Sequence, residues 1–314
     1  MTRTVVALSV VAVGAASAGA PRAQAPARTR SVYVSALTSA GLSAPGLTAT
    51  DISIKEDDKP RPVVSVGPAM EKMSVVLLVD DSGMGIADIR LGVASFVTRL
   101  VGRAEFSLIG IADQNRTLVE FTEDEAKLAN GLVALRSRIG PLGQHLMEAL
   151  TSSMSVLEKR EAVRPVIVVL TNQAHETGNP SLRPIMDRID RSGAALYVVE
   201  IQQPGFQTGL PAGPNENMSA FSRDNDAAEP DRVRLQVLNT GPPATGGRYQ
   251  RLVSSPGAPA AMRSIAQELL DQYVIVFGSE AKPEGTVKIS LSTSKPGVTL
   301  RAPAKSAKSR TSAR

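Results

Sequence analysis

The stretch from Ser74 to Ala87, SVVLLVDDSGMGIA, constrains the fold more than any other part of this 314-residue chain. Five consecutive apolar residues, Val75 to Val79, lead into Asp80-Asp81-Ser82-Gly83 and then into a segment with helical spacing. An apolar run that ends in an acidic turn before an amphipathic helix is typical of a central parallel strand. Such a strand delivers polar groups to the carboxyl edge of its sheet, and we expect any functional site there.

Strand-like and helix-like segments alternate between residues 72 and 278. The expected strands are Val75–Val79, Phe106–Ala112, Thr117–Phe121, Val166–Leu170, Leu196–Ile201 and Tyr273–Phe277, and the expected helices cover 89–100, 146–157, 182–189 and 262–269. This alternation predicts an α/β domain with a doubly wound, mainly parallel, Rossmann-like sheet. Residues 203–244 lack clear periodicity and are rich in Pro, Gly, Asn and Asp, so we expect a loop insertion with a short helix at 231–238.

Apolar and polar residues alternate with a period of two in both flanks of this domain. The pattern predicts an N-terminal β module in residues 26–70 and further β strands in residues 279–301. Because neither flank has enough strands to bury a face, we expect the two to pack together, or onto the α/β domain, as one small β-sandwich-like module. Residues 302–314 contain four basic residues and no acidic one, and are predicted to be a disordered basic tail.

The first 25 residues have the charged, apolar and small-residue regions of a signal peptide, with cleavage expected after Ala18 or Ala25. The protein is therefore expected to be exported, either to the periplasm or out of the cell. The apolar run in this segment is short for a membrane-spanning helix, and no later run reaches about 18 residues, so no membrane span is expected after cleavage. The absence of Cys excludes disulfides, thiolate metal sites and Cys nucleophiles.

The distribution of charge argues against a nucleic-acid partner. The chain has a net charge of +5, but residues 1–30 and residues 302–314 each hold four basic residues and no acidic one. Residues 31–301 are therefore net acidic. A phosphate-binding surface needs a clustered basic face, which this body does not provide.

The turn Asp80-Asp-Ser82-Gly-Met84 resembles the Asp-x-Ser-x-Ser signature of von Willebrand factor type A domains. Three further segments resemble those that follow in the same family, namely Gly143–Leu150, Val168–Gln173 and Thr245–Tyr249. The flanks are similar to a narrower group, the secreted bacterial "VWFA-related" proteins of acidobacterial type: Gly46–Asp57 resembles their leading module, and Tyr273–Phe277 with Lys295–Val298 resembles their trailing one. The resemblance covers nearly the whole chain after residue 25.

This resemblance implies a metal-ion-dependent adhesion site, in which an Asp, two Ser, a Thr and a second Asp hold an ion that bonds an acidic residue of a partner. Asp80 and Ser82 match that pattern. Met84, Gln144 and Asn172 stand where the second Ser, the Thr and the second Asp belong. A thioether is a poor ligand for a hard cation, and one carboxylate is lost, so we expect a degenerate site without a cofactor. The alternative is Mg²⁺ or Ca²⁺ held weakly by Asp80, Ser82 and Asn172.

The predicted function is an exported, non-enzymatic protein-interaction module of adhesion type, with an unknown protein partner. The predicted partner-binding rim consists of Asp80, Asp81, Ser82, Met84, Gln144, His145 and Asn172. We expect Gln144 and Asn172 to hydrogen-bond Asp80 in place of an ion. A structural alternative is that Asp80 and Ser82 cap the following helix.

Two other functions are consistent with the residues. One is an adhesion domain that still depends on Mg²⁺ or Ca²⁺. The other is a hydrolase built on Ser82, His145 and Asp80, although Ser82 lacks the context of a nucleophile elbow and nothing in the sequence orients His145.

Overall fold

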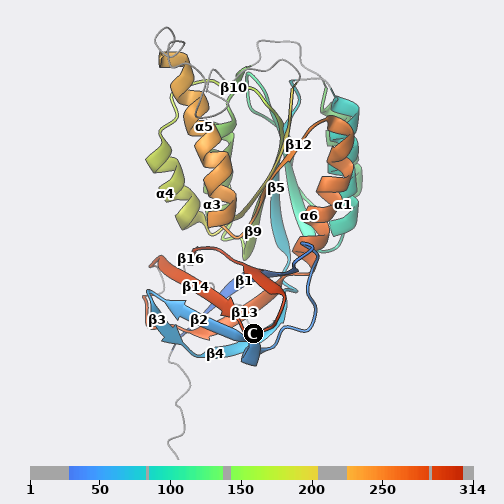
Figure 1. The fold of residues 1–314 in the computed structure, drawn as a ribbon. Coiled ribbons are helices and arrows are strands. Elements are labelled where there is room, and N and C mark those ends of the chain that lie inside the picture. The colour runs from blue at the N-terminus through green and yellow to red at the C-terminus, as the bar shows by residue number, and fades with distance from the viewer. Residues whose placement is uncertain (1–27, 83–84, 137–142, 204–224, 283–284, 307–314) are drawn as a thin grey trace, which may run out of the picture.

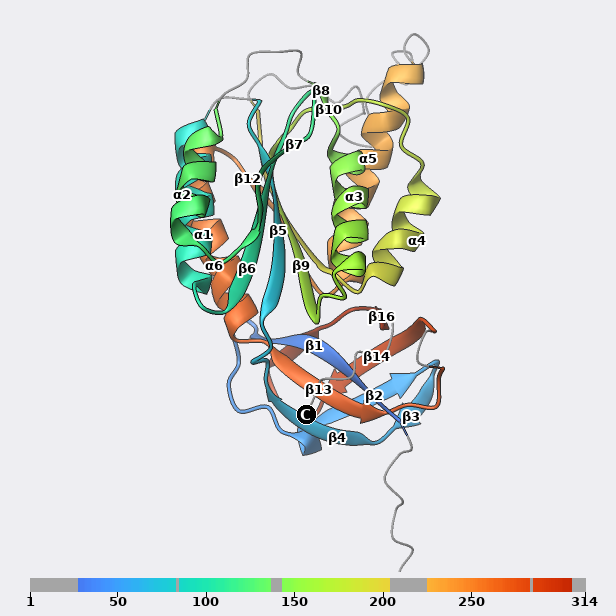
Figure 2. The same ribbon diagram turned by 180° about the vertical axis from the view of Figure 1, so that it is seen from behind.

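The structure, a computed structural model, describes residues 28–82, 85–136, 143–203, 225–282 and 285–306, with the side chains of 225–228 left out. The chain forms an α/β unit, in which a sheet lies between two layers of helices, and a β-sandwich below it (Figure 1). The sandwich lies at the end where the parallel strands begin, as both views show (Figure 2). The carboxyl edge of the sheet is therefore at the far end of the molecule from the sandwich.

The central sheet has six strands in the order β12-β11-β9-β5-β6-β7. Their bounds are Tyr249–Leu252, Ala195–Ile201, Arg164–Asn172, Met73–Asp80, Ala104–Ile111 and Arg116–Thr122. All neighbours are parallel except β6 and β7. All eight residues of β5 are buried because helices cover both faces of the sheet. The predicted doubly wound α/β fold, with its central strand at 75–79, is confirmed.

Among the described residues, three helices cover each face of this sheet. One face carries α1 (Ile86–Leu100), α2 (Glu125–Ala134) and α6 (Ala258–Leu270), and the other carries α3 (Leu146–Lys159), α4 (Leu182–Ser192) and α5 (Asn225–Ala244) (Figure 1). Alternate residues of β5 belong to the two cores: Val75, Leu77 and Val79 pack on the α1 side, whereas Val76 and Leu78 pack on the α3 side. This alternation follows from the two-residue period of a strand.

The β-sandwich is built from both ends of the described chain. One sheet has the order β15-β1-β13-β4 and the other β16-β14-β2-β3. The bounds of these strands are Val298–Arg301, Thr29–Thr38, Tyr273–Gly278, Val63–Pro68, Lys305–Ser306, Val287–Thr293, Ile52–Glu56 and Lys59–Arg61. Apolar side chains from both sheets, including Val34, Ile54 and Ile289, share one core. The predicted module made from the two flanks is confirmed.

The segment Tyr273–Phe277 was expected in the parallel sheet, and this expectation is wrong. It forms β13, which pairs antiparallel with β1 and β4 in the sandwich. The sixth position of the central sheet is taken by the short strand β12, which the sequence pattern did not single out. An apolar run predicts a buried strand but does not identify the strands it pairs with.

The prediction of a loop insertion at 203–244 is also wrong for residues 225–244. Residues 225–244 form the 20-residue helix α5, which extends well beyond the short helix expected at 231–238. Val233, Val237 and Leu238 bury one side of it in the core beneath α3 and α4. Pro230, Pro242 and Pro243 lie inside this helix and disguise its signal, because Pro normally ends a helix.

The predicted tail at 302–314 begins too early. Lys305–Ser306 forms β16, which pairs antiparallel with β14 at Val287 and Lys288. Residues 307–314, the predicted signal peptide in residues 1–25 and residues 204–224 of the predicted insertion lie outside the described residues. In the part of the chain that the structure describes, no helix is both long and apolar enough to cross a membrane.

Candidate interaction site at the carboxyl edge of the sheet

Four chain segments converge above the carboxyl ends of β5 and β9. These two strands are hydrogen-bonded neighbours that end at Asp80 and Asn172. Above them, β8 (Gly143–Gln144) pairs in parallel with β10 (His175–Glu176). The fold thus brings Asp80, Gln144 and Asn172 together although up to 92 residues separate them in the sequence.

The Asp80 carboxylate is the centre of this cluster and has no exposed surface. Its Oδ1 accepts hydrogen bonds from the backbone N–H of Ser82 at 2.8 Å and from the Ser82 hydroxyl at 2.5 Å. Its Oδ2 accepts from Nε2 of Gln144 at 2.5 Å and from the backbone N–H of Asn172 at 2.9 Å. Four donors therefore stabilise one buried negative charge, as a buried carboxylate requires.

Gln144, in β8, contacts the Asp80 carboxylate directly. Its side chain is fully buried, and its Oε1 accepts a hydrogen bond from the Thr171 hydroxyl at 3.1 Å. This second bond fixes the orientation of the amide with its N–H toward Asp80. The expected Gln144–Asp80 hydrogen bond is confirmed, whereas Asn172 contacts Asp80 through its backbone and turns its Oδ1 toward Nε2 of Gln203, at 2.6 Å.

This set of groups does not fit a hard divalent cation in the observed arrangement. Mg²⁺ and Ca²⁺ need several oxygen acceptors directed at one point. Here the hydroxyl of Ser82 and the amide of Gln144 direct hydrogen atoms at the carboxylate instead. Among the residues that the structure describes, no group of three or more His, Asp and Glu side chains could hold a metal ion.

Most of the predicted rim lies below the molecular surface. Asp80, Asp81 and Gln144 have no exposed area and Asn172 is 2% exposed, so these four side chains cannot touch a partner in this conformation. Ser82 and His145 are partly exposed, and Met84 lies outside the described residues. The buried members hold the loops in place, and the surface above them consists of other residues.

Asp81 faces away from Asp80, as the alternation of a strand predicts. Its Oδ2 lies 3.7 Å from a guanidinium nitrogen of Arg116, and its carboxylate packs against Gly110, where an added Cβ would come within 3.0 Å. Asp81 therefore contacts the neighbouring strands β6 and β7 and adds no charge to the Asp80 cluster.

Asp80 and Ser82 do not cap α1, so the structural alternative is wrong. The helix begins at Ile86 with Gly85 as its N-cap residue, and no side chain accepts a hydrogen bond there. Gly85 has φ of +82°, which favours glycine, and an added Cβ would lie 2.6 Å from Ser255. The Ser255 hydroxyl donates to Asp88 at 2.6 Å and joins the start of α1 to the loop after β12.

The structure does not assemble the residues of the hydrolase alternative. The Ser82 hydroxyl donates to Asp80 rather than to a histidine. His145 is the N-cap residue of α3, and its Nδ1 lies 3.7 Å from Glu148. Its backbone oxygen accepts from Nδ2 of Asn115, which ties it to the turn between β6 and β7.

A second layer of buried polar residues lies beneath the cluster, and the sequence analysis missed it. Arg234 of α5 donates to Glu200 at 3.0 Å, to the Asn172 backbone oxygen at 3.2 Å and to the Thr171 hydroxyl at 3.4 Å. Tyr249 donates to Glu200 at 2.7 Å, and burial, with Glu200 as a second cause, raises the pKa of Tyr249 to about 12. Arg234, within the short predicted helix, was the one residue that could have indicated this buried layer. Its position relative to β9 depends on tertiary packing, which the sequence pattern does not show.

The neighbouring strand β10 carries a further buried carboxyl group, Glu176. Its Oε1 accepts from the backbone N–H of Met147 at 3.0 Å, and its own N–H donates to Asp231 of α5 at 2.7 Å. Nδ1 of the half-exposed His175 lies 2.6 Å from the other oxygen of Asp231. Burial raises the pKa of Glu176 to about 8, although the Met147 N–H and Arg234 oppose the shift.

No family model and no curated protein matches the sequence. Solved structures with a similar fold include a von Willebrand factor type A protein from Catenulispora acidiphila. The two sequences are 9% identical, the match covers 91% of this chain and 74% of that chain, and the TM-score is 0.46. Another is the vWF domain of the type V pilus tip protein Mfa5 from Porphyromonas gingivalis, which is 13% identical. That match covers 63% of this chain and 95% of the Mfa5 domain, with a TM-score of 0.43.

Proximal thread matrix protein 1 from the mussel byssus has 12% identity and a TM-score of 0.43; 77% of this chain is covered, and the match spans 50% of the mussel chain. These likenesses concern the fold. The doubly wound sheet, with the Asp80 turn at the end of its central strand, is the arrangement that the resemblance to von Willebrand factor type A domains implies.

Proposed function

We propose that this chain is an exported protein-interaction module that binds its partner at the carboxyl edge of the sheet without a metal ion. The observation that carries the proposal is the Gln144 amide, which donates to Asp80 at 2.5 Å and supplies the positive end of a dipole where an ion would otherwise act. The signal-peptide pattern in residues 1–25 supports export.

The proposed contact surface consists of exposed or partly exposed residues around the buried cluster. Ser82, the turn residues Asp113 and Gln114, and His145 present polar groups above β5, β6 and α3. Val253, in the loop after β12, adds a large apolar side chain that is 82% exposed. A surface that combines an exposed apolar side chain with polar groups is typical of a protein-binding site.

Affinity capture from the native cell envelope tests this proposal. The purified protein is used as bait, with and without a chelator of divalent ions. We expect the same partner to be retained in both conditions, and a Val253→Glu variant to lose at least about tenfold in retention, since a charge replaces an apolar contact.

Leu42→Glu is the matched control, because Leu42 is 68% exposed but lies in the sandwich, far from the proposed surface. It should capture the partner as the native protein does. Loss of capture on chelation would contradict the metal-free part of the proposal. Equal capture by Val253→Glu and the native protein would contradict the assigned surface.

A further inference from the structure

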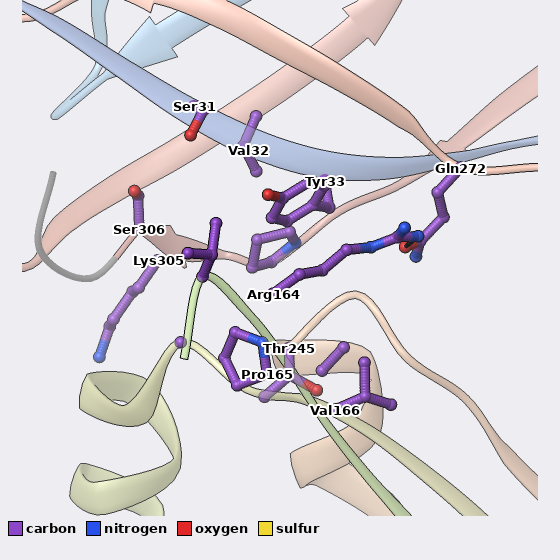
Figure 3. A pocket seen from close by; sticks show the side chains of 14 residues that line it. Ser31, Val32, Tyr33, Arg164, Pro165, Val166, Thr245, Gln272, Lys305 and Ser306 are labelled. Carbon is purple, nitrogen blue, oxygen red and sulfur yellow. Dashed lines mark hydrogen bonds between the residues drawn. The ribbon is translucent and has the colours of Figure 1, made fainter. Parts of the chain in front are cut away.

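A small cavity lies at the junction between the sandwich and the α/β unit, at the opposite end of the sheet from Asp80. Its volume is about 70 Å³, and its lining comes from β1, from the start of β9 and from the C-terminal strand β16 (Figure 3). Pockets for drug-sized ligands and cofactors occupy about 300 Å³ or more. This cavity therefore admits only a small molecule.

Arg164, the first residue of β9, lines the cavity and is 1% exposed. Its guanidinium donates to the backbone oxygen of Ala69 at 3.2 Å, to Oε1 of Gln272 at 2.8 Å and to the backbone oxygen of Leu269. It also lies over the ring of Tyr33, 5.1 Å from the ring centre. Its Nε is buried and has no hydrogen-bond partner among the described residues.

Two other buried arginines differ from Arg164 in one respect. Arg30 has Glu56 at 3.8 Å, and Arg234 has Glu200 at 3.0 Å. All acceptors of Arg164 are neutral, and no ion pair joins it to a carboxylate of the described residues; Glu71 acts on it only at longer range. Burial lowers the pKa of Arg164, but a guanidinium remains a cation at neutral pH.

A buried cation with no carboxylate in contact with it is costly, and an anion in the cavity would lower that cost. The remaining walls define what kind of anion fits. The apolar walls come from Val32, Val163, Pro165, Val166, Ala195 and Pro303, and polar groups of Ser31, Thr245, Gln272 and Ser306 lie among them. Lys305, at one side of the cavity, forms an ion pair with Asp190. The charges of these two side chains therefore already balance each other. Apolar walls with one buried cation suit a short alkyl chain that ends in a carboxylate.

We propose that this cavity is a binding site for a short-chain organic carboxylate, with the carboxylate directed at Arg164 and the alkyl chain against the valine and proline walls. The site shares no residue with the edge of the sheet around Asp80. Its test is therefore independent of the proposed interaction function.

Butyrate is a suitable probe, with chloride, butanol and butylammonium at equal millimolar concentration as comparisons. Isothermal titration and thermal unfolding of the full chain should show saturable binding of butyrate. The three comparison solutes should show none, since each lacks either the charge or the alkyl chain. Absence of binding by butyrate, or an equal effect of chloride, would overturn the proposal.

Variants then locate the site. Val163 lines the cavity but is 45% exposed, so Val163→Phe should narrow the cavity without disturbing the fold and lower butyrate affinity by about tenfold or more. Val156→Phe is the matched control, at a residue of α3 that is 43% exposed and does not line the cavity. Arg164→Met should abolish binding if it folds. Unchanged affinity in Val163→Phe would show that butyrate binds elsewhere and would overturn the assignment.

Discussion

The surroundings of Asp80 show how the residue that meets a carboxylate decides the chemistry of a site. Its carboxylate keeps the position that the resemblance assigns to the first metal ligand, at the end of the central strand. Gln144 meets it with an N–H group, and Thr171 holds that amide in place. A hydrogen-bond donor stabilises a carboxylate as a cation does, with less charge and with a fixed direction.

If the proposed metal-free state is correct, substitution should create metal binding. The triple variant Met84→Ser, Gln144→Thr and Asn172→Asp restores the oxygen ligands that the resemblance implies and removes the competing amide. Thermal unfolding with Mg²⁺, Ca²⁺ or Mn²⁺ should then show an ion-dependent gain of about 2.7 kcal/mol in the free energy of unfolding at 100 times the dissociation constant.

The native protein should show no such gain with any of these ions. An ion-dependent gain in the stability of the native protein, lost in the Asp80→Ala variant, would instead support the metal-dependent alternative. A triple variant that folds but ignores all three ions would argue that further residues of the turn prevent coordination.

At the scale of elements, Glu176 joins β10 to two helices of the same layer. Its carboxyl group accepts the N–H of Met147 in the first turn of α3, and its backbone contacts Asp231 of α5. The start of a helix favours a negative group, but burial here outweighs that effect and favours the protonated form.

The free energy of unfolding should therefore depend on pH through Glu176. Between its ordinary pKa of 4.5 and its raised pKa of about 8, the folded protein keeps the proton and the unfolded chain releases it. The stability that protonated Glu176 contributes is fully present below pH 4.5 and is lost as the pH rises toward 8. The free energy of unfolding then falls by at most about 1.4 kcal/mol per pH unit.

Glu176→Gln keeps both the shape and the Met147 hydrogen bond but cannot titrate, so its unfolding free energy should vary less between pH 5 and pH 8. Chemical denaturation across this pH range measures the difference. Glu148→Gln, at an exposed position of α3, is the control and should give the same pH curve as the native protein. Identical pH curves for Glu176→Gln and the native protein would contradict the role given to Glu176.

At the scale of the whole molecule, Arg164 links the two units. It holds the backbone at Ala69, between β4 and β5, and at Leu269, next to the connection from α6 to β13. These are the two connections by which the chain enters and leaves the α/β unit. Glu268 adds to this junction, since it accepts hydrogen bonds from Ser35 of the sandwich and Tyr197 of the central sheet, each at 2.9 Å.

Arg164→Met should lower the free energy of unfolding by about 3 kcal/mol, because it leaves buried carbonyl groups without donors. Hydrogen exchange should show that the sandwich and the α/β unit no longer open together. Arg263→Met, on the exposed side of α6, is the control and should have little effect. A variant that still opens as one cooperative unit would show that Arg164 does not couple the two units.

Some elements of the fold could be predicted from the sequence and others could not. The strand at 75–79, the alternation around it and the two-residue period of the flanks predicted both the central sheet and the sandwich. Each pattern is local, because the period of apolar residues is fixed by the geometry of the element. The Gln144–Asp80 hydrogen bond also followed, since the family resemblance placed both residues at one site.

Other features were decided by tertiary contacts. The apolar run at 273–277 pairs in the sandwich, and α5 continues through three prolines because its apolar side is buried. Gly247 illustrates the same point, since an added Cβ would lie 1.9 Å from the backbone oxygen of Leu196, a close approach that the order of residues does not reveal.

The sequence by itself determined which segments form strands and helices and where the central strand delivers its polar turn. Only the tertiary structure decided that Asp80 is buried under four donors, that Arg234 and Glu200 support it from below, and that Arg164 is enclosed among neutral acceptors. The physical reason is that periodicity records which side of an element avoids water. The partner of a buried polar group is chosen by long-range packing, which brings together residues far apart in the chain.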